Sequence, residues 1–166
     1  MIVSALKAIG GFLLDAMKAY GLYLLIVVIG TGLAMYVANS VGYSTYGDRP
    51  GTGWFGFHPS LSIRNAEFLG GFVFFTAYAS LLSLFIPALV LVSVGIRRLN
   101  APRLVTVLVL TPLFAAATFW LFAAAGWYIA IDEVFAVLGA VLTVPFCIVV
   151  SSSNGLTVGR LRIRAF

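Results

Sequence analysis

The sequence predicts an all-α integral membrane protein, a bundle of four transmembrane helices preceded by an amphipathic helix at the membrane surface. Hydrophobic residues make up 62% of the 166 residues and charged residues only 9%, whereas a soluble globular chain carries about 25% charged residues. The apolar residues also fall into four long stretches, each sufficient to cross a ~30 Å hydrocarbon layer at ~1.5 Å per residue. We expect a single domain, residues 1–166.

Residues 1–18 are patterned as an amphipathic helix. Ser4, Lys7, Gly11, Asp15 and Lys18 recur at helical spacing on one side, and apolar side chains occupy the other. This pattern predicts a helix that lies in the membrane interface. An extension of the next helix and a face that docks a partner are the alternatives.

Four predicted transmembrane helices follow, and none carries a charge in its interior. They cover residues 19–40, 66–96, 104–127 and 134–153. The second is long enough to span ~45 Å, so as a single helix it must tilt or project beyond the bilayer. Short links make the last three helices an up-down antiparallel unit. Residues 41–65 form the sizeable loop, and residues 154–166 form the tail.

The distribution of charged residues predicts the orientation. One side of the membrane receives Lys7, Lys18, Arg97, Arg98, Arg103, Arg160, Arg162 and Arg164, with Asp15. The other side receives Arg49 and Arg64, with Asp48, Glu67, Asp132 and Glu133. The positive-inside rule then places both termini in the cytoplasm and loop 41–65 outside. Topology therefore explains the net charge of +5, and we expect no nucleic-acid partner.

Residue types that carry chemistry are scarce. Cys147 is the only cysteine and His58 the only histidine, so one chain offers no disulfide, no cysteine-based metal site and no bis-histidine haem. Haem ligation shared with a second subunit or with Met35 stays open. The carboxylates lie at predicted helix ends, not within the bilayer, where ionisable residues usually mark transport pathways. We expect no catalytic residue, no metal site and no cofactor.

Loop 41–65 holds the candidate binding residues, which are aromatic side chains interleaved with glycines and one pair of opposite charges. They are Tyr43, Tyr46, Asp48, Arg49, Trp54, Phe55 and Phe57. One interpretation is an aromatic belt at the outer interface, with glycines that allow a compact turn. The other is a binding surface for a partner subunit, a lipid headgroup or a quinone ring, with Asp48 and Arg49 as polar anchors.

Small residues and prolines predict how the helices pack. Gly30, Ala34 and Ala38 recur every four residues, a pattern that permits close helix packing within or between chains. One proline lies in each of the last three helices, where it tends to cause a kink, and aligned kinks could open a cavity. The tail alternates arginine with apolar residues, which indicates contact with anionic lipid or an extended segment that pairs with a partner's strand.

These observations favour a non-catalytic subunit of a larger inner-membrane complex, such as a secretion, respiratory or transport assembly. Such a subunit would contact its partners through the aromatic loop and the small-residue helix face. A small oligomeric pore or carrier that uses the proline-kinked helices is the alternative, followed by a lipid- or quinone-handling membrane enzyme. The abundance of Arg, Ala and Gly favours a bacterial source. The expected partners are membrane lipid and either other membrane subunits or further copies of the chain.

Overall fold

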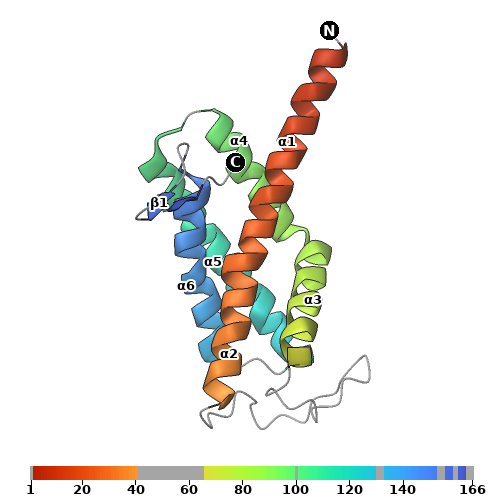
Figure 1. The fold of residues 1–166 in the computed structure, drawn as a ribbon, viewed down its shortest axis with the longest axis vertical. Helices are drawn as coiled ribbons and strands as arrows, with labels where there is room; N and C mark the ends of the chain where they lie inside the picture. The colour runs from red at the N-terminus through yellow and green to blue at the C-terminus, as the bar shows by residue number, and fades with distance from the viewer. Residues whose placement is uncertain are drawn as a thin grey trace.

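The computed structural model describes residues 2–40, 66–99, 101–129, 133–152, 156–158 and 161–163. Most of these residues are helical, and two short paired strands lie in the tail (Figure 1). Three helices are long and apolar enough to cross a membrane, or four if the bent pair Leu69–Ser83 and Phe85–Arg98 is counted as one span. The helical, membrane-type fold predicted from composition is therefore confirmed at this level.

The first helix is continuous and has three segments, α1 (Ile2–Tyr23), the π-helical η1 (Leu24–Ile29) and α2 (Gly30–Ser40). No break separates residues 18 and 19, so the segment expected to lie at the interface as a separate helix continues the spanning helix instead. Neither a proline nor a left-handed residue occurs in this part of the chain that would end α1 there. In Figure 1 the N-terminal part of α1 extends beyond the ends of the other helices.

The second predicted helix is broken. α3 (Ala66–Ser83) and α4 (Phe85–Arg98) meet at Leu84, whose φ of 57° is left-handed, and the two helices are bent by 73°. Pro87 explains the position of the break, because in a continuous helix its ring would clash with the carbonyl of Ser83 and it has no N–H to bond that carbonyl. After the break, Pro87 lies in the first turn of α4, where backbone donors have no helical partner in any case. A sharp bend thus replaces the single tilted helix that we expected.

α5 (Arg103–Ile129) and α6 (Glu133–Val150) lie where the third and fourth apolar helices are predicted. Each contains a proline, Pro112 or Pro145, without a break. The two helices form the most extensive helix pair of the described structure. Gly139 permits this approach, because a Cβ atom at this position would lie only 2.0 Å from Cε2 of Phe122.

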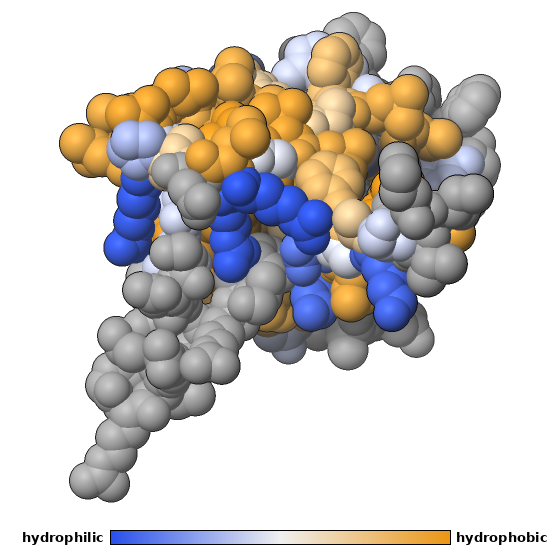
Figure 2. Space-filling model, turned by 90° about the horizontal axis from the view of Figure 1, so that it is seen from above, coloured by the Kyte–Doolittle hydropathy of each residue, from blue (hydrophilic) through white to orange (hydrophobic). Residues whose placement is uncertain are grey.

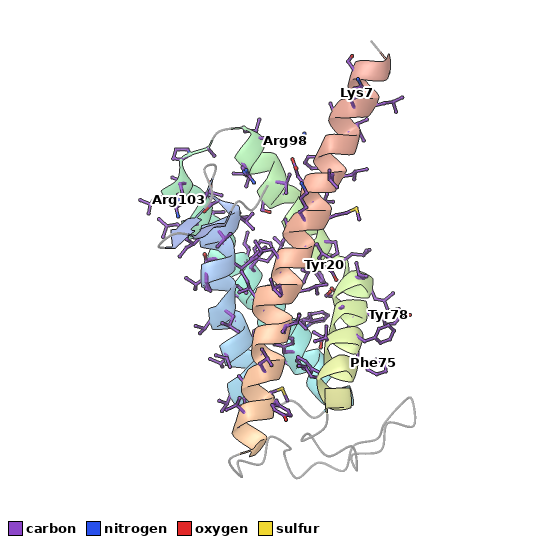
Figure 3. The ribbon with its side chains drawn as sticks, in the orientation of Figure 1. Lys7, Tyr20, Phe75, Tyr78, Arg98 and Arg103 are labelled. Atoms are coloured by element: carbon purple, nitrogen blue, oxygen red, sulfur yellow. The ribbon has the colours of Figure 1, made fainter. Side chains whose placement is uncertain are left out.

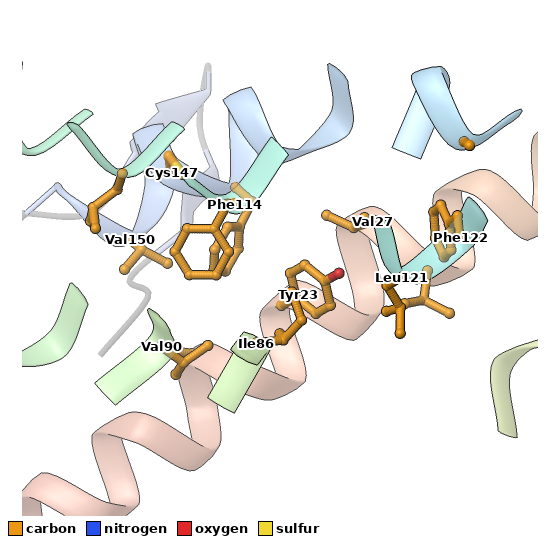
Figure 4. Close-up of a cluster of buried hydrophobic side chains, with 14 of the residues drawn as sticks. Tyr23, Val27, Ile86, Val90, Phe114, Leu121, Phe122, Cys147 and Val150 are labelled. Atoms are coloured by element: carbon orange, nitrogen blue, oxygen red, sulfur yellow. The ribbon is translucent and has the colours of Figure 1, made fainter. Parts of the chain in front are cut away.

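The core lies between the first helix (α1, η1 and α2) and α3, α4, α5 and α6, and its largest side chains are aromatic. Tyr23, Phe114, Phe122 and Phe146 are fully buried. The rings of Phe114 and Phe146 meet edge to face with centroids 5.0 Å apart, and the ring of Tyr23 lies 5.6 Å from that of Phe146; Figure 4 shows Tyr23 beside Phe114. Such pairs add about 0.5–1.5 kcal/mol beyond the area that they bury. Aromatic rings therefore fill the centre of the bundle.

The tail forms a hairpin. β1 (Leu156–Val158) pairs antiparallel with β2 (Leu161–Ile163), and Leu156 lies opposite Ile163. The alternating pattern of the tail thus gives a strand, and its partner is a segment of the same chain.

Basic side chains gather at one end of the bundle. Lys7 and Lys18 lie on α1, Arg97 and Arg98 end α4, and Arg103 begins α5. Figure 2 looks onto this end and shows hydrophilic side chains in one band beside a broad hydrophobic surface. The end of α2 and the start of α3 lie at the opposite end (Figure 1). This is the grouping of charges on which the predicted orientation rests.

Candidate functional site

The residues predicted to bind a partner or ligand fall outside the described residues, because all of them lie in loop 41–65. They are Tyr43, Tyr46, Asp48, Arg49, Trp54, Phe55 and Phe57, and His58 lies there as well. Their role stays a prediction.

The predicted helix-packing residues are described, and they pack inside the chain. A Cβ atom at Gly30 would lie 3.0 Å from Cδ1 of Leu142 on α6. Ala34 and Ala38 are partly buried against the core. In the described structure this face of the first helix is therefore covered by the protein's own helices.

The outward side of α3 and its junction with α4 form an exposed surface of large, mainly apolar side chains. We call this surface the break face. Each of its six residues is at least 50% exposed, and they are Phe74, Tyr78, Leu81, Leu82, Leu84 and Phe85. Figure 3 shows Tyr78 on the side of α3 that points away from the bundle. Trp120 of α5 extends this surface, because its ring meets that of Phe85 edge to face at 5.8 Å.

The break face lies within an uncharged part of the chain. No charged residue occurs between Glu67 and Arg97. At ~1.5 Å per residue, Tyr78 is roughly 16 Å along α3 from Glu67, and Leu84 is roughly 20 Å along α4 from Arg97. A bilayer with a ~30 Å hydrocarbon layer that encloses these helices therefore encloses the break face too.

The backbone at the break departs from the regular hydrogen-bond pattern of a helix. Leu84 N–H bonds the carbonyl of Leu81 at 3.3 Å, and Ala88 N–H bonds the carbonyl of Leu84 at 3.0 Å. The first N–H groups of α4 and the last carbonyls of α3 have no partner within their own helix. In hydrocarbon, each such group costs several kcal/mol unless protein or water satisfies it.

Hydroxyl groups hold the inner side of the break in place. Ser83 Oγ donates to the carbonyl of Ser80 at 2.8 Å, and Ser80 Oγ donates to the carbonyl of Ala77 at 2.8 Å. Tyr20 of α1 donates to the same Ala77 carbonyl at 3.1 Å and lies within hydrogen-bond distance of the Ser80 hydroxyl. A left-handed leucine costs about 1–2 kcal/mol, and these bonds from α1 and α3 help to retain it.

A second hydroxyl pair ties α1 to α5. The hydroxyls of Tyr23 and Thr118 lie 3.0 Å apart, and both residues are fully buried. The hydroxyl of Thr76 on α3 is also buried, but it has no partner among the described residues. Such interhelical hydrogen bonds contribute about 0.6 kcal/mol each on average. They position the helices around the break.

At the basic end, Arg98 joins α4 to α1. Its Nη2 lies 2.7 Å from Oδ2 of Asp15, its Nη1 donates to the carbonyl of Ala8 at 3.5 Å, and its guanidinium lies over the ring of Phe12 at 5.3 Å. The side chain of Arg98 is 41% exposed, so the ion pair alone contributes at most about 1 kcal/mol. This contact positions the helices and offers no reactive group.

The contacts described above hold the helices together. Among the described residues no group of three or more His, Cys, Asp or Glu side chains could hold a metal ion. Sequence reasoning missed Tyr20, Tyr78 and Ser80. A usable signal was present, because a hydroxyl inside an uncharged apolar helix needs a hydrogen-bond partner. Thr76, Ser80 and Ser83 also recur at helical spacing.

No known protein family, curated protein or solved structure matches this chain.

Proposed function

We propose that the chain is a non-catalytic subunit of a larger membrane complex, and that it crosses a bacterial inner membrane four times with both termini in the cytoplasm. The break face is the observation that carries this proposal. Irregular backbone does not face lipid within the hydrocarbon layer, and it is tolerated only against protein or a water-filled cavity. Leu84 and Phe85 are 70% and 60% exposed on the single chain, so we infer that another protein surface covers them.

The closed interior supports a subunit over a pore or carrier formed by one chain. Tyr23, Phe114 and Phe146 are fully buried at the centre of the bundle. Their rings contact one another, which leaves the proline-containing helices α5 and α6 packed around side chains. A pore built from this chain would have to lie between copies.

The charges support the proposed orientation. The basic residues at the end of α4 and the start of α5 lie at the same end as the N-terminal part of α1. Cytoplasmic loops carry the excess of Lys and Arg. Both termini then belong to the cytoplasmic side.

The N-terminal part of α1 adds a second exposed surface. The candidate span Leu6–Ala38 has 33 residues, whereas about 20 are sufficient to cross the hydrocarbon layer. Its apolar side chains Leu6, Ile9, Leu13 and Met17 are 51–70% exposed. We propose that this overhang keeps the interfacial role predicted for residues 1–18 and contacts lipid headgroups or a partner.

Extraction in a mild, non-ionic detergent tests the proposal. A subunit should run as a stable complex that is larger than one chain and contains other proteins at fixed ratios. A chain that is monodisperse at the mass of a monomer, with no companion, would reject the proposed function.

Cysteine labelling tests the orientation separately. Cys147 is buried, so an impermeant maleimide should report only an introduced cysteine. Thr52→Cys should react from outside, and Thr157→Cys only after permeabilisation. The reverse result would refute the orientation.

The outer loop provides a mutational test. Trp54→Ala and Phe57→Ala should weaken association with a partner or ligand, because buried aromatic anchors carry ~2 kcal/mol or more at interfaces. His58→Ala is the matched control and should have a mild effect. A severe defect in His58→Ala, together with a metal or haem spectrum, would show that His58 matters more than the aromatic side chains of the loop.

A further inference from the structure

The exposed side of the first helix is apolar along its whole length. Leu25 and Leu33 each lie two residues from a buried position, about 200° around the helix and therefore opposite the core. The large apolar side chains on this side form what we call the apolar stripe, and they are Leu6, Ile9, Leu13, Met17, Leu25, Leu33 and Val37. Because α1, η1 and α2 are continuous, the N-terminal part of the stripe extends the surface that acyl chains surround in the membrane span.

The length of this helix brings its N-terminal part to the level of the lipid headgroups. The candidate span Leu6–Ala38 has 33 residues, which is ~50 Å at ~1.5 Å per residue. A tilt of ~40°, the upper end of the observed range, shortens its projection to roughly 38 Å, whereas a bilayer with its headgroups is about 40–45 Å thick. Lys7 then lies in the headgroup layer, and Lys18 lies below it, within reach of its long side chain.

The two lysines are free to bind anions. Lys7 and Lys18 are eleven residues apart, close to three full turns, so they lie on the same side of α1. Both are exposed, and neither has an ion-pair partner among the described residues. Asp15, which lies between them in the sequence, is instead paired with Arg98. Figure 2 shows the hydrophilic side chains of this end in a band beside a broad hydrophobic surface.

Charge and apolar surface together identify the partner. The cytoplasmic leaflet carries anionic phospholipids, which attract Lys and Arg side chains next to a membrane helix. An amphipathic helix at the interface places its basic residues among the headgroups and its apolar side toward the acyl chains. A soluble acidic protein could pair with Lys7 and Lys18, but it would not cover a stripe that continues into the hydrocarbon layer. A phospholipid has both the phosphate and the chains.

We propose that the N-terminal part of α1 binds anionic phospholipids of the cytoplasmic leaflet. Lys7 and Lys18 contact the phosphates, and the apolar stripe from Leu6 to Met17 packs against the upper part of the acyl chains. The inference rests on the proposed membrane placement and deepens the proposed function by naming the partner of the α1 overhang.

Fluorescence quenching by labelled lipids tests this surface in liposomes that contain the purified full chain. A fluorophore on Leu13→Cys reports on the N-terminal part of the stripe, and one on Leu33→Cys reports on the part within the span; both positions are exposed. Cys147 is 1% exposed and can stay in place. Chain-nitroxide phosphatidylglycerol should quench Leu13→Cys more strongly than chain-nitroxide phosphatidylcholine, and the two lipids should quench Leu33→Cys equally.

Removal of the lysines provides the second readout. Lys7→Gln should reduce the preference for phosphatidylglycerol by up to about 5-fold, because one lysine near an anionic surface contributes about that factor. Lys18→Gln in the same chain should remove most of the remainder, and high salt should weaken the preference in the unmodified chain.

Two control variants separate local charge from lysine identity and from net charge. Lys7→Arg with Lys18→Arg should retain the preference. Glu133→Gln raises the net charge by one at the other end of the bundle, where α6 begins, and should leave the preference at Leu13→Cys unchanged. Protection of Cys147 from maleimide verifies that each variant remains folded.

The outcomes separate the two proposals. Equal quenching of Leu13→Cys by the two lipids, or a preference that survives loss of both lysines, overturns the anionic-lipid surface. A Leu13→Cys label that neither lipid quenches, while Leu33→Cys is quenched, also overturns it and leaves a soluble acidic protein as the partner. These results come from the purified chain, so they do not depend on companion proteins. A lone chain after mild extraction would reject the larger complex even where the lipid preference is present.

Discussion

Gly139→Ala should destabilise the bundle, because a side chain on α6 at this position would collide with Phe122 of α5. A Cβ atom at this position would lie 2.0 Å from Cε2 and 2.5 Å from Cδ2 of Phe122, whereas ordinary contacts are 3.4–4 Å. Phe122 is fully buried, and its ring lies 6.1 Å from that of Phe72. The ring must therefore shift by more than 1 Å within a filled core, or α6 must move away.

The expected loss follows from the cost of overpacking. Insertion of a methyl group into a packed core costs about 1–3 kcal/mol. For a chain of this length a loss of about 2 kcal/mol lowers the unfolding midpoint by roughly 4–8 °C. The buried Cys147 provides the assay, because a fluorogenic maleimide reacts with this thiol when the protein opens on heating in detergent.

Gly95→Ala is the matched control. Its added Cβ atom meets nothing within 4 Å, so this variant should be neutral or slightly more stable, as expected from helix propensity. Phe122→Leu combined with Gly139→Ala should lose less stability than the two single changes together, because the smaller side chain vacates the space. A midpoint for Gly139→Ala equal to that of Gly95→Ala would refute the close approach of α5 and α6.

Three further predictions use the same thermal assay. Leu84→Gly should raise stability by up to about 1.5 kcal/mol, because glycine avoids the ~1–2 kcal/mol cost of the left-handed conformation but loses ~0.5–1 kcal/mol of chain entropy; Leu84→Ala, which keeps a Cβ atom, should show no gain. Tyr23→Phe should cost about 0.6 kcal/mol, and Thr118→Val in the same chain should add little further loss; additive losses would contradict a shared hydrogen bond. Arg98→Ala should cost more than Asp15→Asn, because Arg98 has contacts beyond the ion pair; equal losses would show that the ion pair dominates.

The sequence was sufficient to predict the helices and their grouping by charge, because long uncharged apolar stretches have few alternatives in a membrane. It was insufficient for the break at Leu84. Three prolines occur in apolar helices, yet only Pro87 follows a break, whereas Pro112 and Pro145 lie inside continuous helices. A proline in an apolar stretch is therefore not sufficient to predict a break.

The packing face shows a similar limit. Gly30, Ala34 and Ala38 suit a helix interface, as predicted, but spacing alone does not identify the partner helix, and in the described structure these residues face their own chain. The tightest approaches occur at Gly139 and Gly32, where an added Cβ atom would lie 2.0 Å from Phe122 and 2.7 Å from Leu69. Neither glycine belongs to the predicted stripe. The side chain that each of them meets is known only from the fold, so the sequence pattern does not single these glycines out.

The π-helical segment η1 has a consequence for the winding of the first helix. The fully buried positions Ala19, Tyr23, Val27, Thr31 and Met35 recur every four residues, although an α-helix completes a turn in ~3.6 residues, so that each four-residue step overshoots by about 40°. Wider turns at Leu24–Ile29 reduce this rotation between Tyr23 and Thr31 and help to keep the buried positions on one side of the helix. The length of η1 should then matter more than the identity of its side chains. Deletion of one of its residues would rotate α2 by about 100° relative to α1 and turn Thr31 and Met35 from the bundle toward lipid.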